Sequence, residues 1–301
     1  MRRHKYTQTG FTLIELIMVM VITGIIAGVV AMFIRTPVDQ YMDIARRAEM
    51  TDIADTALRR MSRDIRTAVP NSVRLPIPAG STYIEFLPTK AGGRYRAGPV
   101  PAGAAQCGGT PAQDILDFTI ADTCFEILGP AITFATGDQI VIGSTQSNGN
   151  PPYQDPTAAA CGIAATSTCI RRPVPAGGAG VQQKVVMTSA YALPPFAALP
   201  SRRFEVVPGD QQAVTYACEN VGGIIDGTGT LTRYWVYGFN AAQVAPPLAG
   251  SSALLAHRIS ACSIVYNMSN PRNALVAITL TITRGGESIS LYQEIHVNNA
   301  P

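Results

Sequence analysis

An apolar run near the N-terminus constrains this chain more than any other feature. It extends from Phe11 to Ile34, and polar side chains interrupt it only at Thr12, Glu15 and Thr23. At about 1.5 Å per residue a helix of this length spans roughly 36 Å, enough to cross a bilayer with some tilt. A carboxylate costs about 2.5–3.5 kcal/mol at the bilayer centre and less toward its edge. We therefore expect Glu15 to have a functional partner.

A short basic leader precedes the run, with Arg2, Arg3 and Lys5 and no acidic residue. A secretory signal peptide places its small residues after the apolar core, where it is cleaved. Here the small residue, Gly10, lies before the core, so cleavage there removes the leader and keeps the apolar segment. Because positive charges stay on the cytoplasmic side, everything after Ile34 is predicted to lie across the membrane.

The order Gly10-Phe11-Thr12-Leu13-Ile14-Glu15 resembles the type IV prepilins. The resemblance implies cleavage by a prepilin peptidase between Gly10 and Phe11, followed by N-methylation of Phe11. It also implies three kinds of partner: other major and minor pilins, the prepilin peptidase/methyltransferase, and the assembly platform of the inner membrane. An ordinary signal anchor that matches by chance is the alternative interpretation.

Cleavage would free an α-amine on Phe11, which is cationic near neutral pH. Glu15 is four residues further on, so a pair within one helix is possible. In the pilin family the favoured partner of this carboxylate is the amine of a neighbouring subunit, and the pair sets the register during assembly. The alternative is a Glu15 side chain that snorkels to the membrane interface.

After the run the sequence predicts an amphipathic stem helix over Val38–Val69, with a kink or a new segment at Pro37 and an end at Pro70. One helical face carries Ala54, Leu58, Met61, Ile65 and Ala68, and the rest carries Arg59, Arg60, Arg63 and Arg66. Asp52, Asp55 and Asp64 are interleaved with these arginines, and removal of the leader leaves 20 Lys and Arg against 20 Asp and Glu. We therefore expect a solvated face or a subunit contact and no nucleic-acid partner.

The remainder is predicted to be β-rich, which gives an α+β fold with a long N-terminal helix packed on a large, mostly antiparallel β domain. The expected divisions are a leader (1–10), a transmembrane or filament-core helix (11–36), a stem helix (37–70) and a periplasmic or extracellular domain (71–301). Turn-rich composition predicts long surface loops at Lys90–Thr110 and Gly143–Gln183. The candidate strands are Tyr83–Leu87, Ile115–Ile120, Gln139–Ile142, Lys184–Ser189, Arg203–Val207, Ala213–Ala217, Leu231–Phe239, Ser260–Tyr266, Leu275–Thr283 and Ser288–Val297.

Six cysteines lie in the part placed outside the cytoplasm: Cys107, Cys124, Cys161, Cys169, Cys218 and Cys262. An even number in an oxidising compartment predicts three disulfides. Fifteen pairings are open to six cysteines, and pairing of sequence neighbours (107–124, 161–169 and 218–262) is the simplest. A zinc site is the competing interpretation, but the chain has no CxxC pair and few histidines.

No catalytic motif is present, so we expect a non-enzymatic protein without cofactor or metal. His257 and His296 are isolated in sequence. Asp114 and Asp117 are three residues apart, so their side chains could lie near one another, but such a pair is weak evidence for a catalytic site. Asp226 is interpreted as a turn residue, with a calcium loop as the alternative.

Further segments resemble the MshO family of minor pilins of the mannose-sensitive haemagglutinin (MSHA) pilus: Tyr41–Val73, Thr215–Cys218, Leu231–Gly238, Cys262–Tyr266 and His296–Pro301. The resemblance implies a minor pilin that initiates, caps or decorates such a pilus. It implies a single-pass protein of the bacterial inner membrane with a cytoplasmic N-terminus, which later moves to the filament at the cell surface. The alternatives are a pseudopilin of a type II secretion system and a pilus-tip adhesin that uses the 143–183 loops, including Tyr153.

Overall fold

The computed structural model describes residues 10–75, 82–98, 106–108, 114–145, 151–154, 168–188, 192–244, 247, 249–267 and 272–300. Apart from Gly10, the expected leader lies outside the described residues. The chain divides into two compact units, Met1–Glu49 and Met50–Pro301. Each unit is described by itself.

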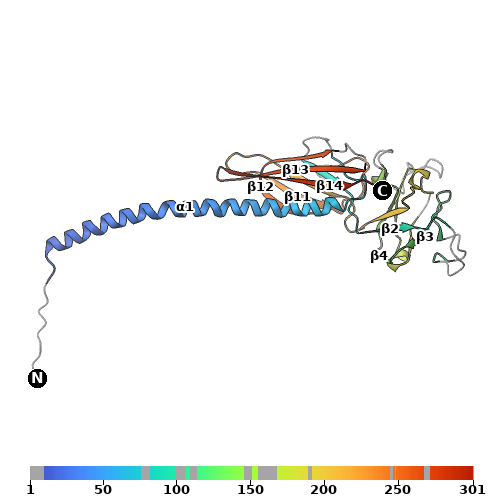
Figure 1. Cartoon of the computed structure of the whole chain (residues 1–301), viewed down its shortest axis with the longest axis horizontal. Coiled ribbons are helices and arrows are strands. Elements are labelled where there is room, and N and C mark those ends of the chain that lie inside the picture. Colours follow the sequence, from blue (N-terminus) through green and yellow to red (C-terminus); the bar gives the residue numbers. More distant parts are fainter. Residues whose placement is uncertain are drawn as a thin grey trace, which may run out of the picture. The chain divides into compact units, whose positions relative to one another are not determined.

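Helix α1 (Leu13–Arg66) forms the first unit and continues into the second. Pro37 lies inside the helix, which is drawn as one uninterrupted coil in Figure 1. A new segment therefore does not begin at Pro37, and the helix continues although proline removes one helical hydrogen bond and crowds the preceding turn. The helix ends at Arg66, three residues before the expected Val69. There the backbone N–H groups of Thr67 and Ala68 donate to carbonyls three residues back, which tightens and closes the last turn.

The C-terminal part of α1 buries the face that the sequence predicts. Ala54, Leu58, Met61 and Ile65 are all 3% exposed or less. They belong to a core that also includes residues of the C-terminal strands, such as Ile278 and Ile295. Burial of one apolar stripe against a sheet is what holds such a helix in place. Ala68 joins the same core from beyond the end of the helix.

That core is covered by a six-stranded antiparallel sheet in the order β1-β10-β11-β12-β13-β14. The strands from β10 onward follow one another in sequence, as in a meander, and β13 and β14 pair over their whole length. The fold is thus α+β, with a long N-terminal helix and large antiparallel sheets. The strand bounds are β1 (Tyr83–Phe86), β10 (Val214–Glu219), β11 (Gly229–Trp235), β12 (Ser251–Asn267), β13 (Asn273–Arg284) and β14 (Glu287–Asn298).

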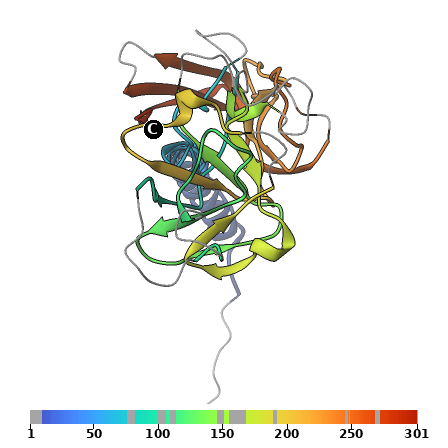
Figure 2. The ribbon, with the colours of Figure 1, turned by 90° about the vertical axis from the view of Figure 1, so that its right-hand side faces the viewer.

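A second six-stranded sheet in the order β6-β5-β9-β2-β3-β8 and a separate β4-β7 pair surround another core. Figure 2 looks onto this region, whose strands are coloured green to yellow. Aromatic side chains dominate its centre, where the Phe125 and Phe204 rings meet edge to face at 5.4 Å between centroids. The strand bounds are β2 (Ala91–Tyr95), β3 (Cys124–Leu128), β4 (Ile132–Phe134), β5 (Gln139–Ile142), β6 (Arg171–Pro173), β7 (Gly180–Gln182), β8 (Lys184–Val186) and β9 (Arg203–Val207); short 3-10 turns occupy Pro151–Tyr153, Ala176–Gly178 and Pro195–Ala197.

One predicted strand is wrong. Ile115–Ile120 forms bends and turns. Asp117 accepts a hydrogen bond from the Thr119 backbone N–H at 2.7 Å, and Asp122 accepts one from the Asp117 N–H at 2.9 Å. Aspartate side chains that bond to nearby backbone groups favour turns over a strand ladder, and this effect outweighs the apolar residues between them.

The two predicted long loops are also partly wrong. The first contains β2, which pairs with both β3 and β9, and the second contains β6 and β7. Strand β2 reads Ala-Gly-Gly-Arg-Tyr and β6 reads Arg-Arg-Pro. Apart from Tyr95, neither contains residues typical of strands. Pairing with neighbouring strands decides their conformation instead.

A buried polar cluster lies between the two cores. Glu85 on β1 is fully buried. Its carboxylate forms an ion pair with Arg74 at 2.6 Å and accepts a hydrogen bond from the Tyr237 hydroxyl at 2.9 Å. The Arg74 guanidinium also lies 3.6 Å from the ring centroid of Tyr153. Burial raises the pKa of Glu85, and the contact with Arg74 opposes that rise. The cluster satisfies groups that would otherwise be costly to bury.

Candidate functional site: the N-terminal segment

The predicted cleavage junction is exposed and non-helical. Gly10, Phe11 and Thr12 precede the first helical residue, and the Phe11 side chain is 86% exposed. A β-carbon added to Gly10 would meet no atom within 4 Å. The backbone at this junction is therefore accessible from the side, as a processing enzyme would need.

Glu15 and Thr12 together cap the start of α1. The Thr12 backbone N–H and hydroxyl donate to one Glu15 carboxylate oxygen at 3.0 and 3.1 Å, and the Glu15 N–H donates to the Thr12 hydroxyl at 3.3 Å. This reciprocal arrangement is a capping box, with threonine at the cap position and glutamate three residues later. It fixes the carboxylate at the positive end of the helix dipole, four residues from Phe11.

Sequence reasoning missed this cap. The spacing Thr12-x-x-Glu15 ahead of an apolar run is its known sequence signal. Because the capping bonds satisfy the carboxylate within its own chain, Glu15 has a structural role in addition to any role in assembly. A test of its function must separate the two.

The apolar part of α1 has the properties of a membrane span. Its most apolar 18-residue window has a mean hydropathy of 2.8 and is not buried within the structure. The Thr23 hydroxyl donates to the Val19 carbonyl at 2.7 Å, so this polar group is satisfied by its own helix. Such satisfaction within the helix is what a hydrocarbon environment requires.

Disulfides link two of the three neighbouring pairs expected from the sequence, Cys107–Cys124 and Cys218–Cys262. Cys169 is also disulfide-bonded, and its expected partner Cys161 lies outside the described residues. The second bond joins β10 to β12.

The polar residues considered as possible catalytic or metal-binding groups are dispersed. Asp114 is fully buried and accepts backbone hydrogen bonds from Gln106 and Cys107, so it supports the loop beside the first disulfide. Asp226 lies in a bend and accepts a 3.1 Å hydrogen bond from the Gly285 N–H, which belongs to the turn between β13 and β14. Among the described residues no three His, Cys, Asp or Glu side chains gather as metal ligands would.

The two histidines among the described residues lie on different strands. His257 is on β12 and His296 is on β14, and both side chains are exposed.

Tyr153 does not lie on a surface. It is 1% exposed, and its hydroxyl donates to the Ser72 carbonyl at 2.7 Å. Tyr153 therefore cannot serve as a surface contact of the adhesin considered as an alternative above. Its ring instead packs against Arg74 in the polar cluster between the cores.

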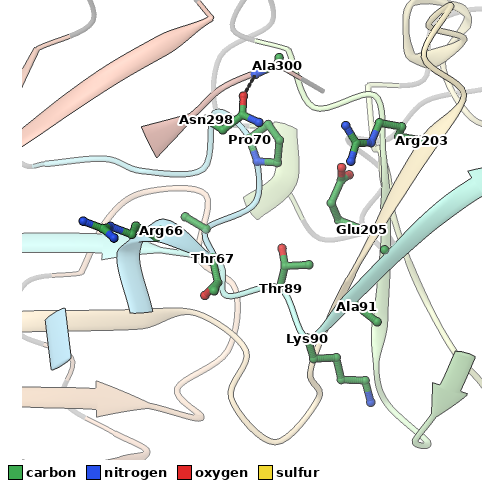
Figure 3. A pocket seen from close by; sticks show the side chains of 12 residues that line it. Arg66, Thr67, Pro70, Thr89, Lys90, Ala91, Arg203, Glu205, Asn298 and Ala300 are labelled. Atoms are coloured by element: carbon green, nitrogen blue, oxygen red, sulfur yellow. Dashed lines mark hydrogen bonds between the residues drawn. The ribbon is translucent and has the colours of Figure 1, made fainter. Parts of the chain in front are cut away.

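A shallow pocket lies where the end of α1 meets β2 and β9, and twelve residues line it (Figure 3). Glu205 points its carboxylate into this pocket from the middle of β9, and Arg203 lies two residues earlier on the same face. Burial raises the pKa of Glu205 to about 7, and the charge of Arg203 opposes the rise. The buried hydroxyl of Thr89 has no hydrogen-bond partner among the described residues.

Comparison with known protein families gives a match over the N-terminal segment. The family described as the prokaryotic N-terminal methylation motif matches residues 5–31. These residues include the Gly10–Phe11 junction, Glu15 and most of the apolar run. No curated protein and no solved structure matches the chain. The chain thus carries a type IV pilin-like prepilin signal, a motif that implies a membrane anchor and assembly with other pilin-like proteins after processing by a prepilin peptidase.

Proposed function

We propose that this chain is a minor pilin that initiates, caps or decorates a type IV pilus of the MSHA type. It is a structural subunit without catalytic activity. A prepilin peptidase cuts between Gly10 and Phe11 and methylates Phe11, and the assembly platform of the inner membrane then inserts the mature chain into a filament. Before assembly α1 crosses the inner membrane once, with the N-terminus in the cytoplasm.

The observation that carries this proposal is the position of the methylation motif. It stands at the start of a helix that is apolar and exposed in its first part and buried on one face in its second. The size of the β-rich region supports a minor rather than a major subunit. Two six-stranded sheets are bulky for a unit that repeats along a filament. A low copy number, at or near the tip, is the natural consequence.

The assembly role of Glu15 is tested by two substitutions that separate charge from capping. In Glu15→Gln the side-chain oxygen still accepts from the Thr12 N–H, but the charge that would attract a neighbouring amine is gone. In Glu15→Val both are lost. Quantification of the chain in sheared filaments should show strong loss in both variants, with membrane insertion unchanged. Normal incorporation of Glu15→Gln would show that the residue acts only as a cap.

The processing site is tested at Gly10. Gly10→Glu should leave the leader attached, because the peptidase would have to accept a charged side chain at the junction, whereas Gly10→Ala should be cleaved. Intact-mass measurement of both membrane-extracted variants separates the two forms. A mature chain beginning at Phe11 in Gly10→Glu would refute this cleavage site.

A further inference from the structure

Strand β14 forms one edge of the first sheet. It is the last strand in the sheet order, with β13 on one side and no strand of the described residues on the other. It runs for 12 residues, about twice the usual length of a strand. A long edge strand exposes a row of backbone donors and acceptors to other chains.

The hairpin turn defines which groups face outward. Arg284 and Glu287 pair across Gly285 and Gly286, whose φ angles of 60° and 79° fit a two-residue turn with positive φ at both positions. The pair that closes such a turn is hydrogen-bonded, and bonded and non-bonded pairs then alternate along the strand. The backbone N–H groups that point to the open edge are therefore those of the even-numbered residues, Ser288, Ser290, Tyr292, Glu294 and His296.

Several features that commonly protect edge strands are missing here, although the strand carries the charged residues Glu287 and Glu294. Its pairing with β13 has no register shift, so no bulge bends the strand away. The segment contains neither proline nor lysine. Of the outward carbonyls, that of Glu294 is bonded by the Gln293 side chain. An edge that is long, regular and weakly protected favours pairing with another strand.

Positive charge lines a groove beside this edge. Gln293 of β14 shares the groove with Arg59, Arg63 and Arg66 of α1, which are spaced four and three residues apart and so lie on one helical face. Arg59 is paired with Asp55 at 2.6 Å. Arg63 and Arg66 are exposed and make no ion pair within the described part of the chain. The groove therefore holds more positive than negative charge.

We propose that the β14 edge and this arginine groove form a docking site for an extended, acidic segment of another protein chain. The segment adds a strand to β14 through the outward backbone groups and places carboxylates against Arg63 and Arg66. Main-chain pairing supplies much of the affinity, and the arginines select an acidic partner. The inference concerns a surface of the β-rich unit that the methylation motif does not touch, and it holds for a pilus or a secretion filament alike.

Strand addition is tested with a fluorescent ten-residue peptide of alternating threonine and glutamate and the full-length protein in detergent. Tyr292→Pro removes an outward N–H and leaves the β13 ladder intact, and Tyr292→Ala is the matched control that loses only the side chain. Anisotropy titration should show binding about tenfold weaker for Tyr292→Pro than for Tyr292→Ala. Equal affinities of the two variants, or no binding of the peptide to the unsubstituted protein, would overturn the proposal.

Charge selection is tested with the same peptide and a second one of alternating threonine and lysine. The double variant Arg63→Glu and Arg66→Glu should bind the acidic peptide about tenfold more weakly and with a smaller dependence on salt. Equal binding of the lysine peptide, or binding of single-stranded DNA that survives Tyr292→Pro, would contradict an acidic protein partner. If Tyr292→Pro does not fold, an acidic peptide with methylated backbone nitrogens gives the same test on the unsubstituted protein, and undiminished binding of that peptide overturns the proposal.

Discussion

Substitution of Glu205 by glutamine should stabilise the protein at alkaline pH and leave it unchanged at acidic pH. Burial raises the pKa of this carboxyl from 4.5 to about 7 in the folded state. Between these values the folded protein holds a proton that the unfolded chain releases, so the free energy of unfolding falls as pH rises. The contribution of Glu205 to the free energy of unfolding is fully present below pH 4.5 and is lost as the pH rises through 7.

The size of the effect follows from the two pKa values. Their difference of about 2.5 corresponds to about 3 kcal/mol, which is an upper bound because Glu205 is only half-buried and solvent reaches the pocket. We therefore expect Glu205→Gln to raise the free energy of unfolding by about 1–2 kcal/mol at pH 8. Glutamine keeps the shape of the side chain and cannot ionise.

Urea unfolding followed by circular dichroism at pH 5 and pH 8 measures this difference. The exposed carboxylate of Asp210 provides a matched control. Asp210→Asn should leave the free energy of unfolding nearly unchanged at both pH 5 and pH 8. A loss of stability in Glu205→Gln at pH 8 would refute the reasoning. It would mean that the ionised carboxylate is held in a favourable ion pair with Arg203.

Three further changes test the cores and the disulfides. Replacing Cys218 and Cys262 together by alanine should lower the free energy of unfolding by about 4 kcal/mol because the bond closes a span of 44 residues. Replacing Cys107 and Cys124 together by alanine should lower it by about 3 kcal/mol, because this bond closes a span of only 17 residues. If urea unfolding showed the larger loss for the Cys107–Cys124 pair, loop entropy would not be the cause. Ile65→Ala removes a fully buried side chain and should cost about 2–5 kcal/mol in the same assay, and an unchanged midpoint would show that α1 does not pack on the first sheet.

The long helix and the first sheet follow closely from local patterns. The spacing of Ala54, Leu58, Met61 and Ile65 predicts the buried face because an amphipathic helix has one stripe to bury. In β13 the alternation of Ile278, Leu280 and Ile282 with threonines predicts a half-buried strand, and the structure buries all three.

The second sheet was much less predictable. Gly92 and Gly93 form the centre of β2 although glycine disfavours strands, because both pair with β9, while β3 pairs with the following Arg94 and Tyr95. Asp117 and Asp122 turn an apolar segment into a loop through bonds that periodicity does not reveal. The Glu205 pocket depends on residues far apart in the sequence and carries no local signal.

At the N-terminus the order of residues alone predicts the Gly10–Phe11 junction and Glu15 as functional positions, and the methylation motif that matches residues 5–31 includes them. The bonds between Thr12 and Glu15 could also have been predicted from the Thr-x-x-Glu spacing. The charge of Glu15 predicts a partner in another subunit, whereas its hydrogen-bond partner within the chain is Thr12, three residues earlier.

Quantitative mass spectrometry of sheared surface filaments tests the minor-pilin proposal most directly. We predict a mature chain that begins at methylated Phe11 and is present at far fewer copies than the major subunit. Absence of the chain from filaments, with retention in the cell envelope and a secretion defect on deletion, would contradict the proposal and favour a pseudopilin.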